Sequence, residues 1–172
     1  MAQTLRIKTA GGLTKMSLSP RIKKTDGFQS RREKHKISSA AQRYINFKAQ
    51  HSQLEFLLAA NIQEGDWFVT LTYDDRHLPD SWAKANSCMQ AFCRKLRESR
   101  KPQKTIYFYN IERAHYSDAE DCCHRWHHHM ILPGDVPLEL LQKLWGRGHI
   151  DGHRIRLNRE ETYGSLATYL LK

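Results

Sequence analysis

Three consecutive histidines are the residues of this chain best suited to holding a metal ion. His127, His128 and His129 fall within Arg125–Leu132, a segment whose aromatic and β-branched residues predict a strand. Side chains of a strand alternate between its two faces, so we expect His127 and His129 on one face and His128 on the other. Two imidazoles on one face form a natural pincer for a divalent ion.

A third ligand is expected from a neighbouring strand. Glu112 ends the predicted strand that precedes the histidines, and Asp121 and His124 are the alternatives. A carboxylate added to two imidazoles suits Mn²⁺ or Mg²⁺ and leaves open positions for a substrate oxygen. The sequence therefore predicts a divalent-metal site made of Glu112, His127 and His129.

The segment Tyr169–Lys172 offers a nucleophile. On a helix, residues three apart are neighbours on one face, so we expect Lys172 beside the phenol of Tyr169. A tyrosine with a pKa near 10 is a poor nucleophile unless a cation assists it. Tyr163 is the rival, but it lies about 600° around the helix from Tyr169 and has no such lysine.

Hydrophobic periodicity predicts the elements that position these groups. We expect strands over Trp67–Tyr73, Lys104–Glu112, Arg125–Leu132 and His149–Leu157, and helices over Trp82–Ser99, Val136–Trp145 and Glu160–Leu171. This order is the split βαβ arrangement of ferredoxin-like, RRM-like α+β folds, with a mostly antiparallel sheet and helices on one face. The other face of the sheet is then free for a ligand.

The charge of the chain points to a polyanionic partner. The formal net charge is +10 at pH 7, and residues 1–36 hold ten Lys and Arg against two acidic residues. Nucleic acid is the commonest partner of so basic a protein. We expect residues 1–37 to form a flexible basic arm that contacts phosphates, with a solubilising tail as the alternative. A helix at about 38–60 and a core over 66–172 would make up one domain, 38–172.

The cysteines and the hydropathy indicate the compartment. The chain has four cysteines, Cys88, Cys93, Cys122 and Cys123. Their spacing matches neither a zinc knuckle nor a disulfide framework, which suits a reducing cytoplasm. A structural zinc site built from Cys122, Cys123, His115 and His124 is an alternative. No run approaches the ~18 apolar residues of a membrane span, so we expect a soluble protein in the cytoplasm of a host cell, without a membrane partner.

Three segments, in this order, resemble the motifs of a known family. They are Phe68–Tyr73, Glu112 followed by His127–Leu132, and Tyr169–Lys172. The family is that of the HUH rolling-circle replication initiators of phages and small plasmids, and Leu144–Gly148 is also similar to their replication-associated proteins. One difference is His128, where the family has an apolar residue; if buried, this imidazole needs a hydrogen-bond partner.

The resemblance implies sequence-specific nicking and joining of DNA, with a 5′-phosphotyrosine intermediate and a free 3′-hydroxyl. His127, His129 and Glu112 would hold Mn²⁺ or Mg²⁺, Tyr169 would attack, and Lys172 would assist it. The substrate would be single-stranded or hairpin origin DNA, and the host helicase and polymerase would be partners. The candidate DNA contacts are Thr70, Thr72, Arg113, Arg125, Arg147, Arg154 and Arg156.

Two other functions remain open from the sequence. A transposase or a conjugative relaxase shares the paired histidines and the tyrosine but serves a different pathway. A non-catalytic module could instead hold single strands on its sheet, with metal-independent binding and no covalent product. The sequence leaves the oligomeric state and the recognised DNA sequence undetermined.

Overall fold

A computed structural model describes residues 3–20, 39–114 and 125–171 of the chain. The chain divides into two compact units, Met1–Ala60 and Asn61–Lys172. The second unit carries every predicted site residue. None of the helices in the described ranges combines the length and the apolar composition that crossing a bilayer requires.

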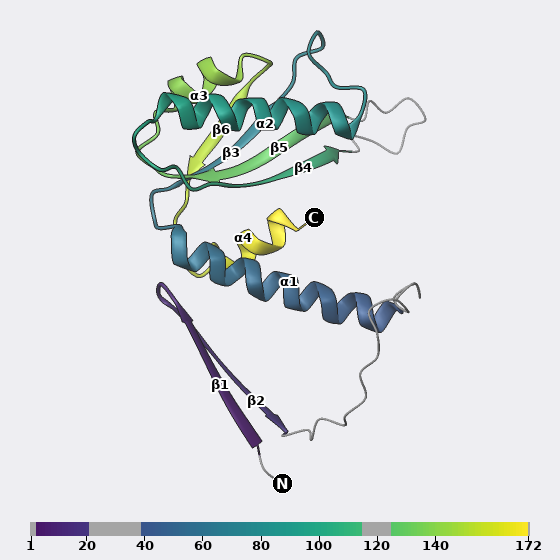
Figure 1. The fold of residues 1–172 in the computed structure, drawn as a ribbon, viewed down its shortest axis with the longest axis vertical. Coiled ribbons are helices and arrows are strands. Elements are labelled where there is room, and N and C mark those ends of the chain that lie inside the picture. The colour runs from purple at the N-terminus through teal and green to yellow at the C-terminus, as the bar shows by residue number, and fades with distance from the viewer. Residues whose placement is uncertain (1–2, 21–38, 115–124, 172) are drawn as a thin grey trace. The chain divides into compact units, whose positions relative to one another are not determined.

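The second unit is built on a four-stranded antiparallel sheet with the order β4-β5-β3-β6 (Figure 1). The strands are β3 (Trp67–Thr72), β4 (Phe108–Ala114), β5 (Arg125–Leu132) and β6 (Ile150–Arg154). The helices are α2 (Trp82–Ser99), α3 (Leu138–Trp145) and α4 (Tyr163–Leu170). The strand order and the two crossovers through α2 and α3 give the predicted split βαβ arrangement of an α+β fold.

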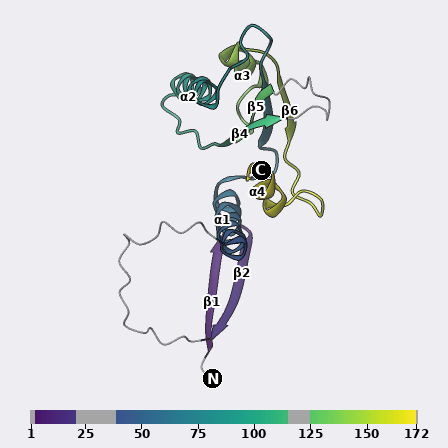
Figure 2. The same ribbon diagram turned by 90° about the vertical axis from the view of Figure 1, so that its right-hand side faces the viewer.

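Helices α2 and α3 cover one face of the sheet, and α2 forms a separate layer beside the strands (Figures 1 and 2). The apolar face of α2 contributes Met89, Phe92 and Leu96 to the core. Alternate residues of the strands, such as Leu71 and Met130, point into the same core. We call this side of the sheet the core face and the opposite side the site face.

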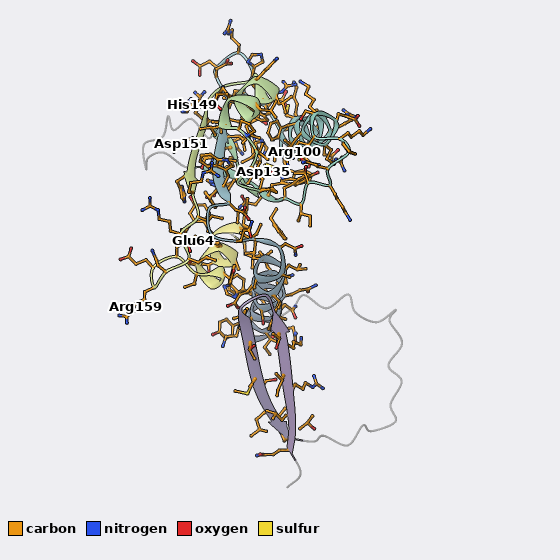
Figure 3. The ribbon with its side chains drawn as sticks, turned by 90° about the vertical axis from the view of Figure 1, so that its left-hand side faces the viewer. Glu64, Arg100, Asp135, His149, Asp151 and Arg159 are labelled. Atoms are coloured by element: carbon orange, nitrogen blue, oxygen red, sulfur yellow. The ribbon has the colours of Figure 1, made fainter. Side chains whose placement is uncertain are left out.

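Polar contacts fix the ends of these elements. Ser81 caps α2, its hydroxyl accepting a hydrogen bond from the Lys84 amide. At the other end, Arg100 pairs with Asp135 at 2.8 Å and so ties the end of α2 to the turn after β5 (Figure 3). The indole of Trp145 donates to the carbonyl of Thr72 at 2.8 Å, which holds α3 against β3.

Three element boundaries differ from the prediction for local reasons. Strand β4 begins at Phe108 and not at Lys104, since the hydroxyl of Thr105 accepts from the Arg100 guanidinium and the ladder starts only at Phe108. Strand β6 ends at Arg154 because Ile155 exchanges hydrogen bonds with the loop before β3.

Helix α4 starts at Tyr163 and not at Glu160. The side chain of Asn158 accepts the amide protons of both Glu160 and Glu161, which makes a turn in place of the first helical turn. Thr162 and Ser165 then form a reciprocal capping box.

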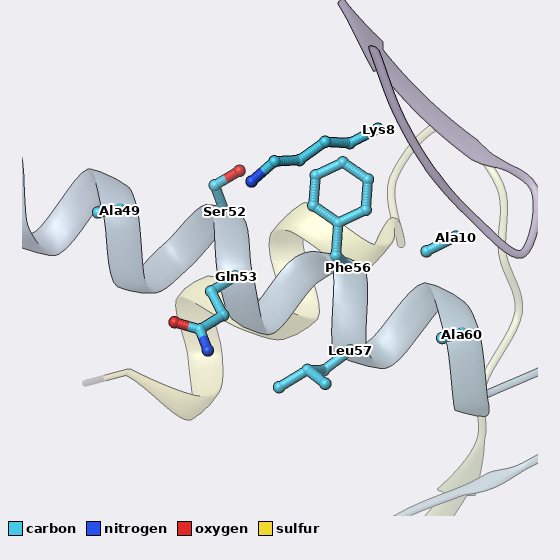
Figure 4. Close-up of a pocket in the computed structure, with 8 residues that line it drawn as sticks. All are labelled: Lys8, Ala10, Ala49, Ser52, Gln53, Phe56, Leu57 and Ala60. Carbon is cyan, nitrogen blue, oxygen red and sulfur yellow. The ribbon is translucent and has the colours of Figure 1, made fainter. Parts of the chain in front are cut away.

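The first unit contains a β-hairpin and a long helix. The hairpin pairs β1 (Gln3–Ala10) with β2 (Leu13–Pro20), and the helix is α1 (Ala40–Asn61), close to the predicted span. Lys15 of the hairpin forms an ion pair with Glu55 and lies over the ring of Phe56. An open groove of about 760 Å³ runs along α1, where Lys8 is the only ionisable residue of the described lining (Figure 4).

The hairpin differs from the flexible arm expected for residues 1–37. Gly11 adopts a positive φ of 52° at the two-residue turn, where a side chain would also meet the carbonyl of Ala59. The register places Leu5 opposite Leu18 and Ile7 opposite Met16. Alternating residues on both sides of a Gly-Gly pair are a hairpin signal, which the high charge of the segment obscures.

Candidate metal centre and adjoining tyrosine

Strand pairing brings the predicted metal ligands together on the site face. Glu112 of β4 lies directly opposite His127 of β5, and His129 lies two residues further along the same face. Nε2 of His127 is 3.6 Å from the Glu112 carboxylate, and Nε2 of His129 is 3.3 Å from it. The three donor atoms all lie within 4.8 Å of one another.

These distances fit a single divalent ion. Two donors that each bind at ~2.1 Å lie roughly 3–3.5 Å apart when they subtend 90–110° at the ion. The side chains of His127 and His129 are nearly buried, at 12% and 4% exposure, whereas Glu112 is one-third exposed. The group is therefore preformed on the protein side and open on the carboxylate side.

The second nitrogen of each imidazole faces an oxygen. Nδ1 of His129 lies 3.1 Å from the hydroxyl of Thr70, and Nδ1 of His127 lies 3.5 Å from the carbonyl of Arg125. With Nδ1 protonated and donating to these oxygens, each Nε2 keeps its lone pair toward Glu112. Lone pairs that converge on a carboxylate repel one another unless a cation lies among them, so this donor set fits a bound metal ion.

Asn110 was not predicted from the sequence but lies on the same face, opposite His129 and two residues before Glu112. Its side-chain oxygen is buried and has no hydrogen-bond partner among the described residues. A buried acceptor without a donor costs free energy. A metal ion, or a water bound to one, would satisfy it with the oxygen chemistry that Mg²⁺ and Mn²⁺ prefer.

Tyr169 of α4 adjoins the candidate ligands. Its ring centroid lies 4.8 Å from that of His129 and 5.2 Å from that of Phe68, edge-on in both cases. The capping box fixes where α4 starts, and the buried residues Leu166 and Leu170 fix which side of it packs on the domain. Tyr169 is nevertheless 37% exposed, so solvent or a substrate can reach it.

The rival tyrosine is engaged elsewhere. The hydroxyl of Tyr163 donates to the backbone carbonyl of Ile62 at 3.3 Å, which is a structural contact. The predicted helper Lys172 lies outside the described residues, as do the alternative ligands Asp121 and His124 and the alternative zinc ligands His115, Cys122 and Cys123. Their predicted roles stay predictions.

His128 points to the core face and is fully buried. Its Nε2 lies 2.7 Å from the hydroxyl of Tyr73, and its ring packs edge-on against Trp145. Burial lowers the pKa of His128 to about 4, so this imidazole is neutral above that pH. The same burial raises the pKa of Tyr73. The partner that a buried His128 requires is therefore Tyr73.

The two threonines predicted to face DNA lie on the site face, but their hydroxyls make contacts within the protein. Thr70 contacts Nδ1 of His129, and Thr72 donates to the carbonyl of His149 at 3.0 Å. Thr70 is therefore placed to orient a candidate metal ligand. Contact of either threonine with DNA stays a prediction.

The five predicted arginines divide by location. Arg113 and Arg154 lie opposite Trp126 and Trp67, two core-face residues, and their guanidinium groups stack over those rings at 5.4 and 3.6 Å. Arg154 also donates to two backbone carbonyls.

The remaining three arginines are Arg125, Arg147 and Arg156. Arg125 pairs with Asp75 at 2.7 Å. No ion pair holds the Arg147 or Arg156 side chain within the described ranges. Those two guanidinium groups are the freest of the five for contact with phosphates.

Comparison with known proteins identifies the family. The model of a family of replication-associated proteins, the ORF2 family, matches residues 66–172, more than half of the chain. The chain belongs to this family. It is thus a replication-associated protein, and the matched region is the part that carries the candidate metal ligands and Tyr169.

Two further comparisons add little. The crystal structure of the hypothetical protein ORF119 from Sulfolobus islandicus rod-shaped virus 1 is similar with a TM-score of 0.43 and 12% identity, over 75% of this chain and 91% of that chain. Similarity at this level supports no conclusion about function. No curated protein matches the chain.

Proposed function

We propose that this replication-associated protein is a metal-dependent nickase of the HUH class that cuts single-stranded DNA through Tyr169 and initiates rolling-circle replication. The observation that carries the proposal is the adjacency of the Tyr169 ring, 4.8 Å from that of His129, to the group Glu112, His127 and His129. Membership of a replication-associated family favours this function over transposition or conjugative transfer.

The proposed reaction is a transesterification. The phenol oxygen of Tyr169 attacks the scissile phosphorus, and a new phosphorus–oxygen bond forms as the bond to the 3′ oxygen breaks. The phenol loses its proton to solvent and the departing 3′ oxygen takes one up, so no co-reactant is needed. The products are a 5′-phosphotyrosine and a free 3′-hydroxyl, and the reverse reaction rejoins strands.

Residues of the chain would divide the work as follows. Glu112, His127 and His129 hold a divalent ion, Mn²⁺ or Mg²⁺, which when bound polarises a phosphate oxygen. Thr70 orients His129 through Nδ1. Tyr169 stays in position because α4 is capped and packed, and Lys172 supports its phenolate.

The substrate would be unpaired or locally melted origin DNA. A tyrosine on a helix packed against the sheet cannot reach a phosphate held in a regular duplex. The net charge of +10 favours binding of the phosphate backbone at low salt. Arg147 and Arg156, which have no ion-pair partner among the described residues, are the arginines we assign first to that role.

The test is a covalent-adduct assay. The chain is incubated with Mn²⁺ and a single-stranded DNA pool with a randomised segment, labelled in one sample at the 3′ end and in another at the 5′ end. We expect the 3′ label to migrate with the protein on a denaturing gel and the 5′ label to appear on a shortened strand. EDTA and Tyr169→Phe should each abolish both signals, while the matched control Tyr163→Phe keeps them.

Two results would contradict the proposal. An adduct that persists in Tyr169→Phe would show that another residue is the nucleophile. The absence of an adduct from every pool, including one with origin-like hairpins, would exclude the nicking reaction.

A further inference from the structure

A second cavity adjoins the candidate metal centre and shares residues with it. It has a volume of about 450 Å³ and lies between β3, β6 and α4. Phe68, Thr70 and Tyr169 line it, and the same three residues contact His129. A cavity of this size falls within the ~300–1,000 Å³ range of pockets that hold organic groups.

Aromatic rings form one wall of this cavity. The Phe68 ring stacks on that of His153, with centroids 5.2 Å apart and planes inclined by 26°, and the Tyr169 ring meets Phe68 edge-on. The side chain of His153 is 62% exposed, so a ring face remains open. Nucleobases stack on such rings whatever their identity, since each has a π face.

The remaining polar lining is acidic. Asp151 and Glu160 line the cavity, as does Glu161, which accepts from the Arg156 amide at 2.7 Å (Asp151 is labelled in Figure 3). No Lys or Arg occurs among the described lining residues, although the chain as a whole is strongly basic. Within the described part of the chain, the Asp151 and Glu160 carboxylates form no ion pair. Such a lining repels phosphate and attracts hydrogen-bond donors.

We propose that this cavity is a recognition pocket for one unpaired nucleobase that carries an exocyclic amino group, next to the phosphate that Tyr169 attacks. The base stacks against the aromatic wall, and its amino group donates to Asp151 or Glu160, as cytosine N4 donates to carboxylates in other complexes. Thymine is disfavoured because it presents a carbonyl oxygen where cytosine presents the amino group. The position beside the nick rests on the proposed function.

The first experiment measures binding without nicking. The full chain is titrated with fluorescent dC12 and dT12 in EDTA at pH 8, and affinity is read by anisotropy. We expect dC12 to bind about 10-fold tighter than dT12, since one good base contact is worth ~1–3 kcal/mol. The double variant Asp151→Asn, Glu160→Gln should reduce this ratio to about 1.

A charge-matched control separates recognition from general electrostatics. Glu64→Gln, Glu139→Gln removes two exposed carboxylates that lie outside the cavity, so it should tighten both oligonucleotides alike and keep the ratio. Equal affinities of the unaltered chain for dC12 and dT12 would overturn the proposal. A ratio that survives in Asp151→Asn, Glu160→Gln would overturn it as well.

The second experiment locates the pocket relative to the nick. Adducts from the randomised pool are sequenced for the unaltered chain and for both double variants. We expect the Asp151→Asn, Glu160→Gln variant to lose the discrimination against thymine, about 10-fold, at one nucleotide flanking the nick. A profile unchanged there would overturn the placement. If no adduct forms at all, the nicking proposal fails, while the dC12 and dT12 ratio still decides whether the pocket binds a base.

Discussion

The two faces of strand β5 put the same side chain to opposite uses. His128 is buried on the core face, hydrogen-bonded to Tyr73, and has a pKa lowered to about 4. His127 and His129, its immediate neighbours, face Glu112 on the other side of the sheet. Residue type therefore does not decide whether a histidine stabilises or binds; the side of the sheet on which it lies decides it.

The difference also shows how closely stability and chemistry are coupled here. A shift of β5 by one residue would send His128 to the site face and both candidate ligands into the core. The contact of His128 with Tyr73 and the packing against Trp145 oppose such a shift, since they are lost if the register changes. The core face thus holds the site face in register.

The largest expected effect separates the two faces by metal affinity. His129→Ala should weaken Mn²⁺ binding by more than about 1,000-fold, well beyond the 10–100-fold typical of changes outside the ligand set. His128→Leu, in contrast, should leave the Mn²⁺ affinity within a few-fold of the original. Isothermal titration calorimetry measures both. Equal losses in the two variants would contradict the assignment of the histidines to opposite faces.

The next effect concerns the dependence of stability on pH. The pKa of His128 is about 4 in the folded chain, against 6.5 for an unperturbed histidine. Between these values the unfolded chain binds a proton that the folded chain does not, so stability falls as the pH falls from 6.5 to 4. The full contribution is about 3 kcal/mol. Urea unfolding at pH 7.5, 5.5 and 4.5 measures it.

A double variant provides the control for this pH effect. His128→Leu alone takes the Nε2 partner from the buried Tyr73 hydroxyl and should cost about 1–3 kcal/mol at pH 7.5. Adding Tyr73→Phe removes that hydroxyl and should recover part of the loss. Both variants should show a flatter pH dependence than the original chain; an unchanged slope would assign the effect to other groups.

A smaller effect is expected from the residue behind a candidate ligand. Thr70→Val removes the oxygen that faces Nδ1 of His129 and should weaken Mn²⁺ binding about 10-fold. Thr72→Val is the matched control, because the Thr72 hydroxyl donates to the His149 carbonyl and contacts neither imidazole. Calorimetric affinities of the two variants should therefore differ. Equal affinities would remove Thr70 from its orienting role.

The smallest effect tests the arginines on the core face. Arg154 donates to the carbonyls of Gly65 and Gly134 and stacks on Trp67, so Arg154→Ala should lower the free energy of unfolding by about 1 kcal/mol. Arg156→Ala should change stability by less than about 0.5 kcal/mol and weaken single-strand binding more. The reverse pattern would make Arg154 the DNA contact and Arg156 the structural residue.

The sequence alone determined the order and type of the elements of the second unit. Hydrophobic periodicity predicted strands and helices near their observed positions, because alternation and the 3.6-residue period are local properties. The alternation of the strand was also enough to separate His128 from its neighbours. The family match agrees with the resemblance to replication proteins, which rested on three short segments.

Only the tertiary structure decided which distant residues meet. Glu112 and His127 are paired by the register of β4 and β5, and the approach of Tyr169 to His129 depends on where α4 begins and packs. The roles of Asn110, Tyr73 and the acidic cavity beside Phe68 were likewise invisible in the sequence. Propensity acts over a few neighbouring residues, whereas register and helix packing depend on contacts between residues up to about a hundred positions apart.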